Sequence, residues 1–289
     1  MLDRFTTLGG GLDHPEGVAW DPDERVLYAG GEAGQLYRVT LDGEVDQVAN
    51  TGGFLLGIAV GADGAVFACD VGAGAVVRID PRTGACERFA DGAGGGDGMR
   101  APNWLAFDRR GSLFVTDSGD WGKGDGRVWI VDRDGTARVW TDRTNRLPNG
   151  CCLTADEDGL LVVETNAPGV SRVPIRDDGT AAEPEPFVDL PDTVPDGIAL
   201  CADGSVLVSC QRPDAVYVVR PEGGTASLLV HDPTGQLLGS PSNVCWAGPE
   251  LDRLVTSNLG RWHLAIGDLS ATELRGTALP RPFAEPSAG

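Results

Sequence analysis

The chain has 289 residues and a formal net charge of −20, with 42 glycines, 19 prolines and a hydrophobic fraction of 41%. The acidic balance argues against binding nucleic acid or an anionic membrane through bulk electrostatics. No apolar run approaches the roughly 20 residues needed to span a bilayer. The composition favours a globular chain with a buried core and many turns.

Short strands separated by turns are expected from the start of the chain. Residues 1–4 show no basic region followed by an apolar stretch, so we expect no signal peptide. Residues 3–8 are a candidate for a closing strand that joins the end of the chain. A first unit of four strands is then predicted at residues 17–21, 25–30, 35–41 and 45–50, directly after Glu16.

The same pattern recurs along the chain. Apolar runs rich in β-branched residues alternate with Gly/Asp/Asn/Pro clusters, and acidic turns such as Ala202-Asp203-Gly204 indicate hairpins. The units start near Glu16, Gly57, Asn103, Asn149, Asp196 and Asn243, which lie 41 to 47 residues apart. A period in this range with four strands per unit is typical of a β-propeller. We therefore predict an all-β fold: one six-bladed β-propeller domain over residues 1–289, with four-stranded antiparallel blades around a central channel.

Three segments need separate interpretation. The glycine-rich stretch 91–98 is predicted to be a loop between blades, because no helix and no Lys-Ser/Thr follows it as in a phosphate-binding loop. The later strands of blade six are expected at residues 254–257, 263–268 and 273–279. The residues from Pro280 onward are expected to form a loose tail.

The cysteines give no sign of a metal or thiol site. There are seven, and none forms a C-x-x-C pair. Five of them fall inside predicted strands, where cysteine behaves as a small buried hydrophobe. A metal–thiolate or catalytic role would need partners at suitable spacing, and none is visible. This pattern suits a reducing cytoplasm, which is the compartment we expect.

The residues at the unit starts carry the chemistry. In antiparallel blades every innermost strand begins on the same face, so Glu16, Asn103, Asn149 and Asp196 should converge at one end of the channel. Two carboxylates and two amide carbonyls form an all-oxygen set that suits one hard divalent cation, with Ca²⁺ first, Mg²⁺ or Mn²⁺ behind it, and Zn²⁺ as an acceptable guest. Gly57 cannot be a ligand, and Asn243 is a candidate outer partner. The alternative interpretation, that these are turn formers at strand starts, does not account for Glu16.

The ordered set of motifs resembles the senescence marker protein/gluconolactonase family along essentially the whole chain. The matching pieces are Glu16-Gly17 before a Trp-Asp-Pro strand, Pro102-Asn103, Phe114-Val115-Thr116-Asp117, Pro148-Asn149-Gly150 and Pro195-Asp196-Gly197. The resemblance implies a six-bladed propeller in which Glu16, Asn149 and Asp196 hold a divalent cation and Asn103 borders metal and substrate. It also implies Asp196 as general base in the opening of sugar lactones. Diisopropyl fluorophosphatase and the paraoxonases are similar in architecture.

Two departures from the family pattern concern the substrate. Trp104 follows Asn103 where relatives commonly have Asp, and Arg100 lies three residues before Asn103 rather than two. With Trp121 and Trp262 in loops of the same face, the indoles favour a substrate with an alkyl or aromatic portion. Arg100 or Arg212 could then orient its carboxylate or phosphate. The alternative for each indole is packing between blades.

The sequence leaves three functions open. The leading one is a metal-dependent lactonase acting on a small molecule, with Asp196 as the catalytic residue. The second uses the same centre for isomerisation, cyclisation or phosphotriester hydrolysis of a less polar substrate. The third is non-catalytic, with the cation only joining the blades. We expect no nucleic-acid or membrane partner, and a monomer or a weak homo-oligomer.

Overall fold

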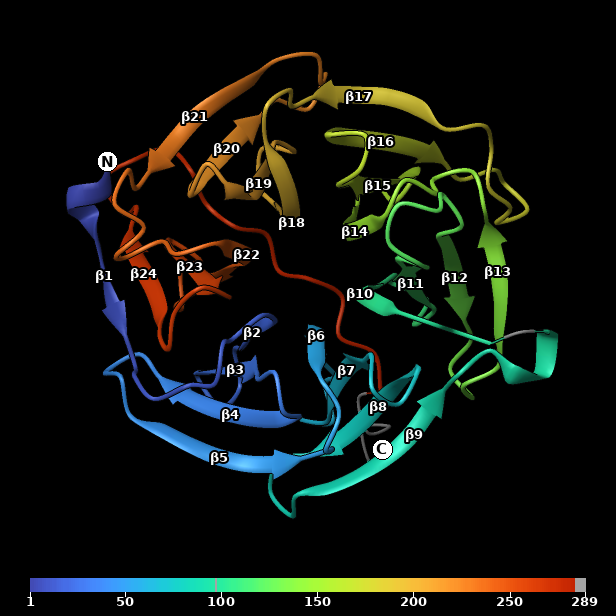
Figure 1. Cartoon of the computed structure of the whole chain (residues 1–289), viewed down its shortest axis with the longest axis horizontal. Helices are drawn as coiled ribbons and strands as arrows, with labels where there is room; N and C mark the ends of the chain where they lie inside the picture. The colour runs from blue at the N-terminus through green and yellow to red at the C-terminus, as the bar shows by residue number, and fades with distance from the viewer. Residues whose placement is uncertain (97, 284–289) are drawn as a thin grey trace, which may run out of the picture.

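The chain forms six four-stranded antiparallel sheets arranged around a central axis, as in a six-bladed β-propeller (Figure 1). The computed structural model describes residues 1–96 and 98–283. Two short 3₁₀ helices, η1 (Leu2–Arg4) and η2 (Ala93–Gly95), are the helical elements of this described part. The predicted fold class is confirmed.

The first three blades follow one another in chain order, each running from the channel outward. Blade one consists of β2 (Val18–Asp21), β3 (Val26–Gly30), β4 (Gln35–Thr40) and β5 (Val45–Asn50). Blade two consists of β6 (Leu55–Val60), β7 (Val66–Asp70), β8 (Ala75–Asp80) and β9 (Ala85–Ala90). Blade three consists of β10 (Pro102–Phe107), β11 (Leu113–Asp117), β12 (Arg127–Val131) and β13 (Ala137–Thr141).

The next blades repeat this order. Blade four consists of β14 (Pro148–Leu153), β15 (Gly159–Glu164), β16 (Gly169–Pro174) and β17 (Glu185–Asp189). Blade five consists of β18 (Val194–Leu200), β19 (Val206–Arg212), β20 (Ala215–Val219) and β21 (Ala226–His231). Blade six combines β22 (Pro241–Ala247), β23 (Arg253–Asn258) and β24 (Leu264–Asp268) with β1 (Phe5–Leu8).

Blade six closes the ring with a strand from the other end of the chain. β1 pairs antiparallel with β24, from Phe5 opposite Gly267 to Leu8 opposite Leu264. The closing strand predicted at residues 3–8 is thus confirmed over Phe5–Leu8, while residues 3 and 4 belong to η1. The strand predicted at residues 273–279 is wrong: this segment makes one isolated bridge, from Gly276 to Cys201. The outer edge of β24 is already occupied by β1, so no ladder position remains for it.

The segment from Thr277 to Phe283 crosses the face where the inner strands end, which we call the bottom face (Figure 1). Arg281 binds Asp23 (2.7 Å) and the buried Asp21 (3.2 Å), and its guanidinium donates to the carbonyl of Gly61 (2.9 Å). The ring of Phe283 stacks on Phe67, with centroids 5.2 Å apart. The expectation of a loose tail from Pro280 is therefore wrong for residues 280–283, because ion pairs and aromatic packing anchor them; residues 284–289 lie outside the described part.

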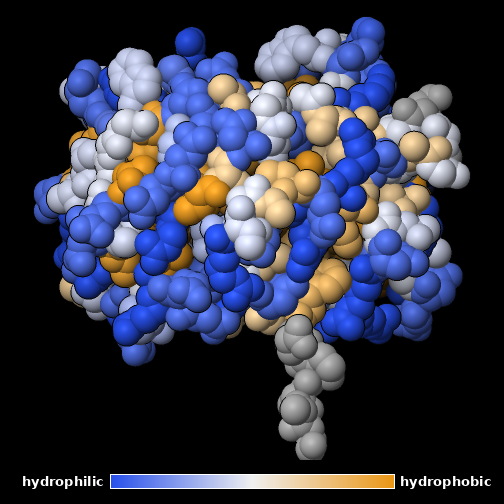
Figure 2. Space-filling model, turned by 90° about the horizontal axis from the view of Figure 1, so that it is seen from below, coloured by the Kyte–Doolittle hydropathy of each residue, from blue (hydrophilic) through white to orange (hydrophobic). Residues whose placement is uncertain are grey.

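Apolar clusters between neighbouring blades form the core. Phe67 of β7, for example, packs edge-on against Phe107 of β10, with centroids 5.2 Å apart. The side seen edge-on in Figure 2 is mostly hydrophilic with scattered apolar patches, consistent with the acidic composition. Among the described residues, no helix is long and apolar enough to cross a membrane.

Candidate metal centre

Four polar side chains predicted from the sequence lie buried where the inner strands begin, which we call the top face. Their relative exposures are 4% for Glu16, 9% for Asn103, 7% for Asn149 and 1% for Asp196. The inner strands of neighbouring blades contact one another around the axis. We call these four residues the oxygen ring.

Glycines directly after the ring positions allow the inner strands to approach closely. A Cβ on Gly150 would lie 2.6 Å from the carbonyl oxygen of Asp196, and one on Gly197 would lie 2.7 Å from that of Ser242. Real Cβ atoms do not approach backbone so closely, so any side chain there would push neighbouring blades apart. The glycines therefore have a packing role that the turn interpretation alone did not capture.

Buried hydroxyl groups fix the backbone of the ring from the neighbouring blade. Thr116 donates to the carbonyl of Asn149 (2.6 Å), and Thr165 to that of Pro195 (2.8 Å). Ser257 donates to the carbonyl of Glu16, across the closure of the propeller. Blades three, four and six thus each hold the strand start of the next blade through a short polar side chain.

The ring oxygens themselves lack partners, which tests whether a cation fits. Among the described residues, no hydrogen bond reaches Glu16 Oε2, Asn103 Oδ1, Asn149 Oδ1 or Asp196 Oδ1, although all four atoms are buried. A buried polar oxygen without a partner is costly and rare. Four of them, all hard acceptors, match the ligand preference of a divalent cation such as Ca²⁺. The residues present therefore fit the predicted metal.

The two carboxylates resist ionisation in this environment. Burial raises the pKa of Glu16 well above its ordinary value, and the charge of Asp196 raises it further. Burial raises the pKa of Asp196 to about 7, although the amides of Gln211 and Asn149 partly offset this by hydrogen bonding to its ionised form. Two like charges in a buried site favour a bound cation that would compensate them.

Asn243 is buried beside the start of blade six and has unpartnered amide atoms. Its exposure is 1%, and neither Oδ1 nor Nδ2 has a hydrogen-bond partner among the described residues. Its predicted role as an outer partner of the site stays a prediction. Gly57, as expected, offers no ligand; a Cβ there would lie 2.6 Å from Trp104 Cα.

The guanidinium of Arg100 is already bound by the loop between β11 and β12. The guanidinium pairs with Asp125 (2.8 Å), donates to the Asp125 carbonyl (2.9 Å) and lies 3.7 Å from Asp120. A substrate anion would have to compete with these carboxylates. Arg212, at the end of β19, is exposed. Binding of substrate by either arginine stays a prediction.

The three tryptophans predicted to bind substrate differ in their surroundings. Trp104 is 8% exposed and packs in the cluster between blades three and four, at the position where blades one, two, four and five have glycine. This is the packing alternative, and it gives no support to an indole on the top opening. Trp121 and Trp262 are 75% and 57% exposed. Their predicted contact with substrate remains untested.

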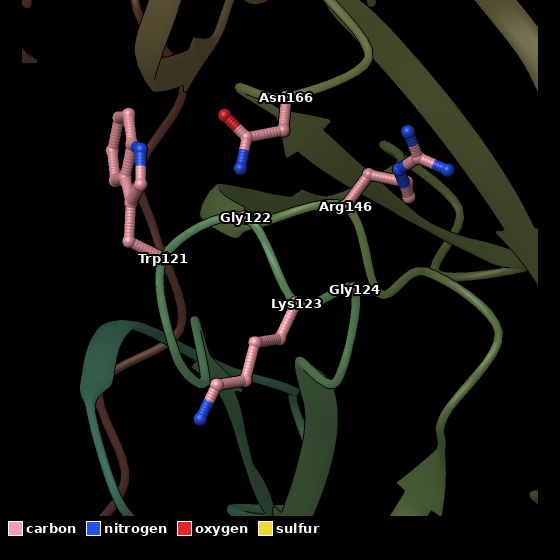
Figure 3. Close-up of a pocket in the computed structure, with 6 residues that line it drawn as sticks. All are labelled: Trp121, Gly122, Lys123, Gly124, Arg146 and Asn166. Atoms are coloured by element: carbon pink, nitrogen blue, oxygen red, sulfur yellow. The ribbon is translucent and has the colours of Figure 1, made fainter.

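Trp121 borders a shallow pocket of about 300 Å³ between top-face loops (Figure 3). Asn166 lies across the pocket from the indole, and Arg146 lines the same side as Asn166 (Figure 3). Lys123 binds Asp120 (2.6 Å). This pocket offers an apolar ring and polar donors to a ligand.

A small cluster at the rim also contains ligand types. His14 Nδ1 lies 3.1 Å from Asp13 Oδ1 and 3.4 Å from Glu32 Oε2. The ring of His14 packs against Trp262, with centroids 5.4 Å apart. These groups are partly exposed and already pair with one another, which gives them a local structural role. His263 bonds to the carbonyl of Leu237 (3.3 Å).

Sequence reasoning missed Gln211 as a contact of the ring. Its side-chain amide donates to Asp196 Oδ2 and leaves Oδ1 as the unpartnered oxygen. The signal was its place in the repeat: Ser118 and Thr165 occupy the same position after their strands, and Ser118 donates to the carbonyl of Pro148 (2.8 Å). A polar residue at this position in three successive blades indicates contact with the neighbouring strand start.

The sequence of the chain is similar to a known protein family and to two individual relatives. The family model described as SMP-30/Gluconolactonase/LRE-like region matches residues 14–258. A gluconolactonase of Zymomonas mobilis subsp. mobilis is 26% identical over 220 residues, which are 66% of this chain and 57% of that protein. Protein STRICTOSIDINE SYNTHASE-LIKE 4 of Arabidopsis thaliana is 28% identical over 228 residues, 71% of this chain and 60% of that protein. The matches thus span less than two thirds of either relative.

Solved structures share the fold over nearly the whole chain. A gluconolactonase of Xanthomonas campestris superposes with a TM-score of 0.78 at 26% identity, covering 92% of this chain and 89% of that one. Regucalcin of Agrobacterium tumefaciens, described as a calcium-binding protein, gives a TM-score of 0.76 at 18% identity over 96% and 98% of the two chains. At that identity the second similarity shows the fold alone.

Proposed function

The chain belongs to the SMP-30/Gluconolactonase/LRE-like family, and on this basis we propose that it is a divalent-metal-dependent hydrolase that opens lactone rings. The reaction would take place at the top of the central channel, with Glu16, Asn103, Asn149 and Asp196 holding one cation. The gluconolactonase relatives support the lactonase class. Ca²⁺ is the first candidate for this cation, because all four ligands are hard oxygens.

The single observation that carries this proposal is the set of four buried, unpartnered oxygens in the ring. A purely structural polar network would satisfy its own acceptors. When bound, the cation would polarise the lactone carbonyl and stabilise the negative charge that develops on it.

Asp196 is proposed as the general base. The amide of Gln211 donates to Oδ2, so Oδ1 is the oxygen that would hold the cation and, through its second lone pair, take a proton from the attacking water. Burial raises the pKa of this carboxyl to about 7. This value applies to the metal-free chain; a bound cation would lower the pKa and keep the carboxylate ionised, in the form that accepts a proton. The amide of Asn149 donates to Thr165 Oγ1 (3.3 Å), which leaves its Oδ1 for the cation.

A less polar substrate is the second candidate, and the exposed indoles favour it. Trp121 and Trp262 present large apolar surfaces on the top face, and position 104 lacks the carboxylate that would bind sugar hydroxyls. A lactone with an alkyl or aromatic portion would bury against such rings. Isomerisation, cyclisation or phosphotriester hydrolysis at the same centre, and a non-catalytic role, remain alternatives to the lactonase.

A panel of lactones tests the proposal. Hydrolysis of gluconolactone and of alkyl- and aryl-substituted lactones would be followed by proton release, with Ca²⁺ and with chelator. We expect metal-dependent opening of at least one class, with higher kcat/KM for the apolar members and lower kcat/KM in Trp121→Ser. Preference for gluconolactone over every apolar lactone would contradict the less polar substrate and indicate a sugar lactonase. No metal-dependent opening of any lactone would contradict the proposed activity.

A further inference from the structure

The inner strands and bottom-face residues of the central channel line a partly open cavity of about 560 Å³. Its floor is the C-terminal segment, where Thr277 to Arg281 line it on the bottom face. In Figure 1 this segment runs from β24 across the centre of the propeller to blade two. The volume lies within the range of roughly 300–1,000 Å³ typical of small-molecule sites.

The cavity exists because one small residue from every blade lines it at the same level. Each lies two or three residues beyond the start of its repeat; they are Ala19, Ala59, Ala106, Cys152, Ala199 and Cys245. A bulge or register shift near the start of the inner strand, recorded in blades two to six, separates this level from the ring above. Larger apolar side chains at these positions would fill the channel.

Stability alone does not explain such a void. Atoms that line an empty cavity lose packing partners, so small residues on every side are unfavourable unless something occupies the space. Water would need two to four polar partners, and the alanine and cysteine walls provide few. Of the charged groups in the lining, Arg281 pairs with Asp21 and Asp23, and Arg109 lies 3.5 Å from Glu157, while Arg25 is exposed.

Two indole groups on the wall carry unused hydrogen-bond donors. Trp246 is 6% exposed, and its Nε1 is buried without a hydrogen-bond partner among the described residues. The thiol of Cys201 lies beside it and is at best a weak acceptor. Nε1 of Trp20, in blade one, is likewise buried and unpartnered within the part of the chain that the structure describes. Buried indole N–H groups usually find an acceptor.

We propose that this cavity binds an uncharged, mainly apolar small molecule that carries a hydrogen-bond acceptor, such as an aromatic or alicyclic ketone. Its apolar body would lie against the six small residues, and its acceptor would take the N–H of Trp246 or Trp20. The site is separate from the metal centre and does not depend on the proposed function. Access would be from the bottom face, where the segment carrying Arg281 forms the floor.

The neutral fluorescent ketone Prodan is a suitable probe, because it has a carbonyl acceptor and its emission shifts to the blue in apolar surroundings. Titration of the full chain should show saturable binding near one probe per chain, both with Ca²⁺ and with chelator. Ala106→Leu and Ala59→Leu, which fill the cavity from two blades, should each weaken binding at least about 10-fold. Ala85→Leu, the same change at an exposed position of β9, is the matched control.

Trp246→Phe keeps an aromatic ring, although a smaller one, and removes the N–H; it should weaken binding by about 3- to 10-fold, as expected for one neutral hydrogen bond. Circular dichroism would confirm that each variant is folded. Glu16→Gln should leave the affinity unchanged, which separates this site from the metal ring. Absence of saturable binding in the native chain, or binding unaffected by both filling variants, would overturn the proposal. Loss of binding on chelation would also overturn it, since the probe would then occupy the metal centre.

Discussion

The carboxylate of Asp196, at the start of blade five, raises the pKa of Glu16, at the start of blade one. Both side chains are buried, and burial is the larger cause of the upward shift for each of them. Two carboxyl groups that are so placed either keep their protons or share a cation. The relationship between these two residues therefore links pH, metal binding and stability.

Metal binding and stability of the metal-free chain should depend on pH in opposite directions. The pKa of Asp196 is raised from 3.8 to about 7, so between these values the folded chain holds a proton that the unfolded chain releases. Stability of the metal-free chain therefore falls as pH rises through this window, since the unfolded state binds fewer protons. Ca²⁺ affinity should rise over the same window, because the ligands must lose protons. Urea unfolding and calcium titration from pH 5 to 8 would check both trends; stability that increases with pH in the metal-free chain would contradict them.

Substitution of the two carboxylates should separate metal binding from catalysis. Asp196→Asn keeps an oxygen for the metal but removes the basic group, so kcat should fall by about 100-fold or more at saturating Ca²⁺. Glu16→Gln should mainly weaken metal affinity, and excess Ca²⁺ should partly restore activity. Steady-state kinetics at several calcium concentrations would distinguish the two. Near-full activity of Asp196→Asn with saturating metal would show that another group is the base.

Thr116→Val tests the hydroxyl that positions Asn149. Thr116 Oγ1 donates to the Asn149 carbonyl (2.6 Å) and accepts from the Trp104 amide (3.0 Å), and valine has the same shape without the hydroxyl. Each buried group left unpaired should cost about 1–3 kcal/mol of unfolding free energy. Calcium affinity should also fall, because the side-chain amide of Asn149 would be displaced. Thr7→Val, on an exposed strand position, is the control. Equal urea midpoints for the two variants would refute the positioning role.

Gly150→Ala tests the close approach of blades four and five. The added Cβ would lie 2.6 Å from the carbonyl oxygen of Asp196, so the strands must separate. We expect a loss of about 1–3 kcal/mol in stability, as for other overpacking changes, together with weaker metal binding. Gly10→Ala, where a Cβ meets nothing within 4 Å, should change neither. The two denaturation curves measured side by side decide the matter, and coincident curves would disprove the packing argument.

The repeat pattern predicted the propeller because four short strands recur every 41 to 47 residues. It also predicted that Glu16 and Asp196 lie buried where inner strands begin, as the structure has them. Their role as metal ligands stays a prediction. Gln211 was harder to assign, because its contact with Asp196 depends on side-chain direction within the repeat. The packing of Trp104 between blades follows from its occupying a glycine position, which becomes visible only when the register of all blades is known.

The C-terminal segment could not be predicted because it follows no repeat. Arg281 pairs with Asp21 and Asp23 from the other end of the chain, and Phe283 packs on Phe67 of blade two. Neither contact has a local sequence signal. Likewise, the ion pair of Arg100 with Asp125 depends on the conformation of the loop between β11 and β12. This loop is rich in glycine, so its sequence does not determine one backbone conformation.

Elemental analysis of the metal bound after reconstitution tests the central claim most directly. The native chain and the double variant Glu16→Gln/Asp196→Asn would be stripped with chelator, dialysed in separate samples against Ca²⁺, Mn²⁺ or Zn²⁺, and measured at equal protein concentration. The account predicts one calcium ion per native chain and a large loss of calcium from the double variant. A native chain that retains no Ca²⁺, Mn²⁺ or Zn²⁺, or a double variant that binds as much as the native chain, would contradict it.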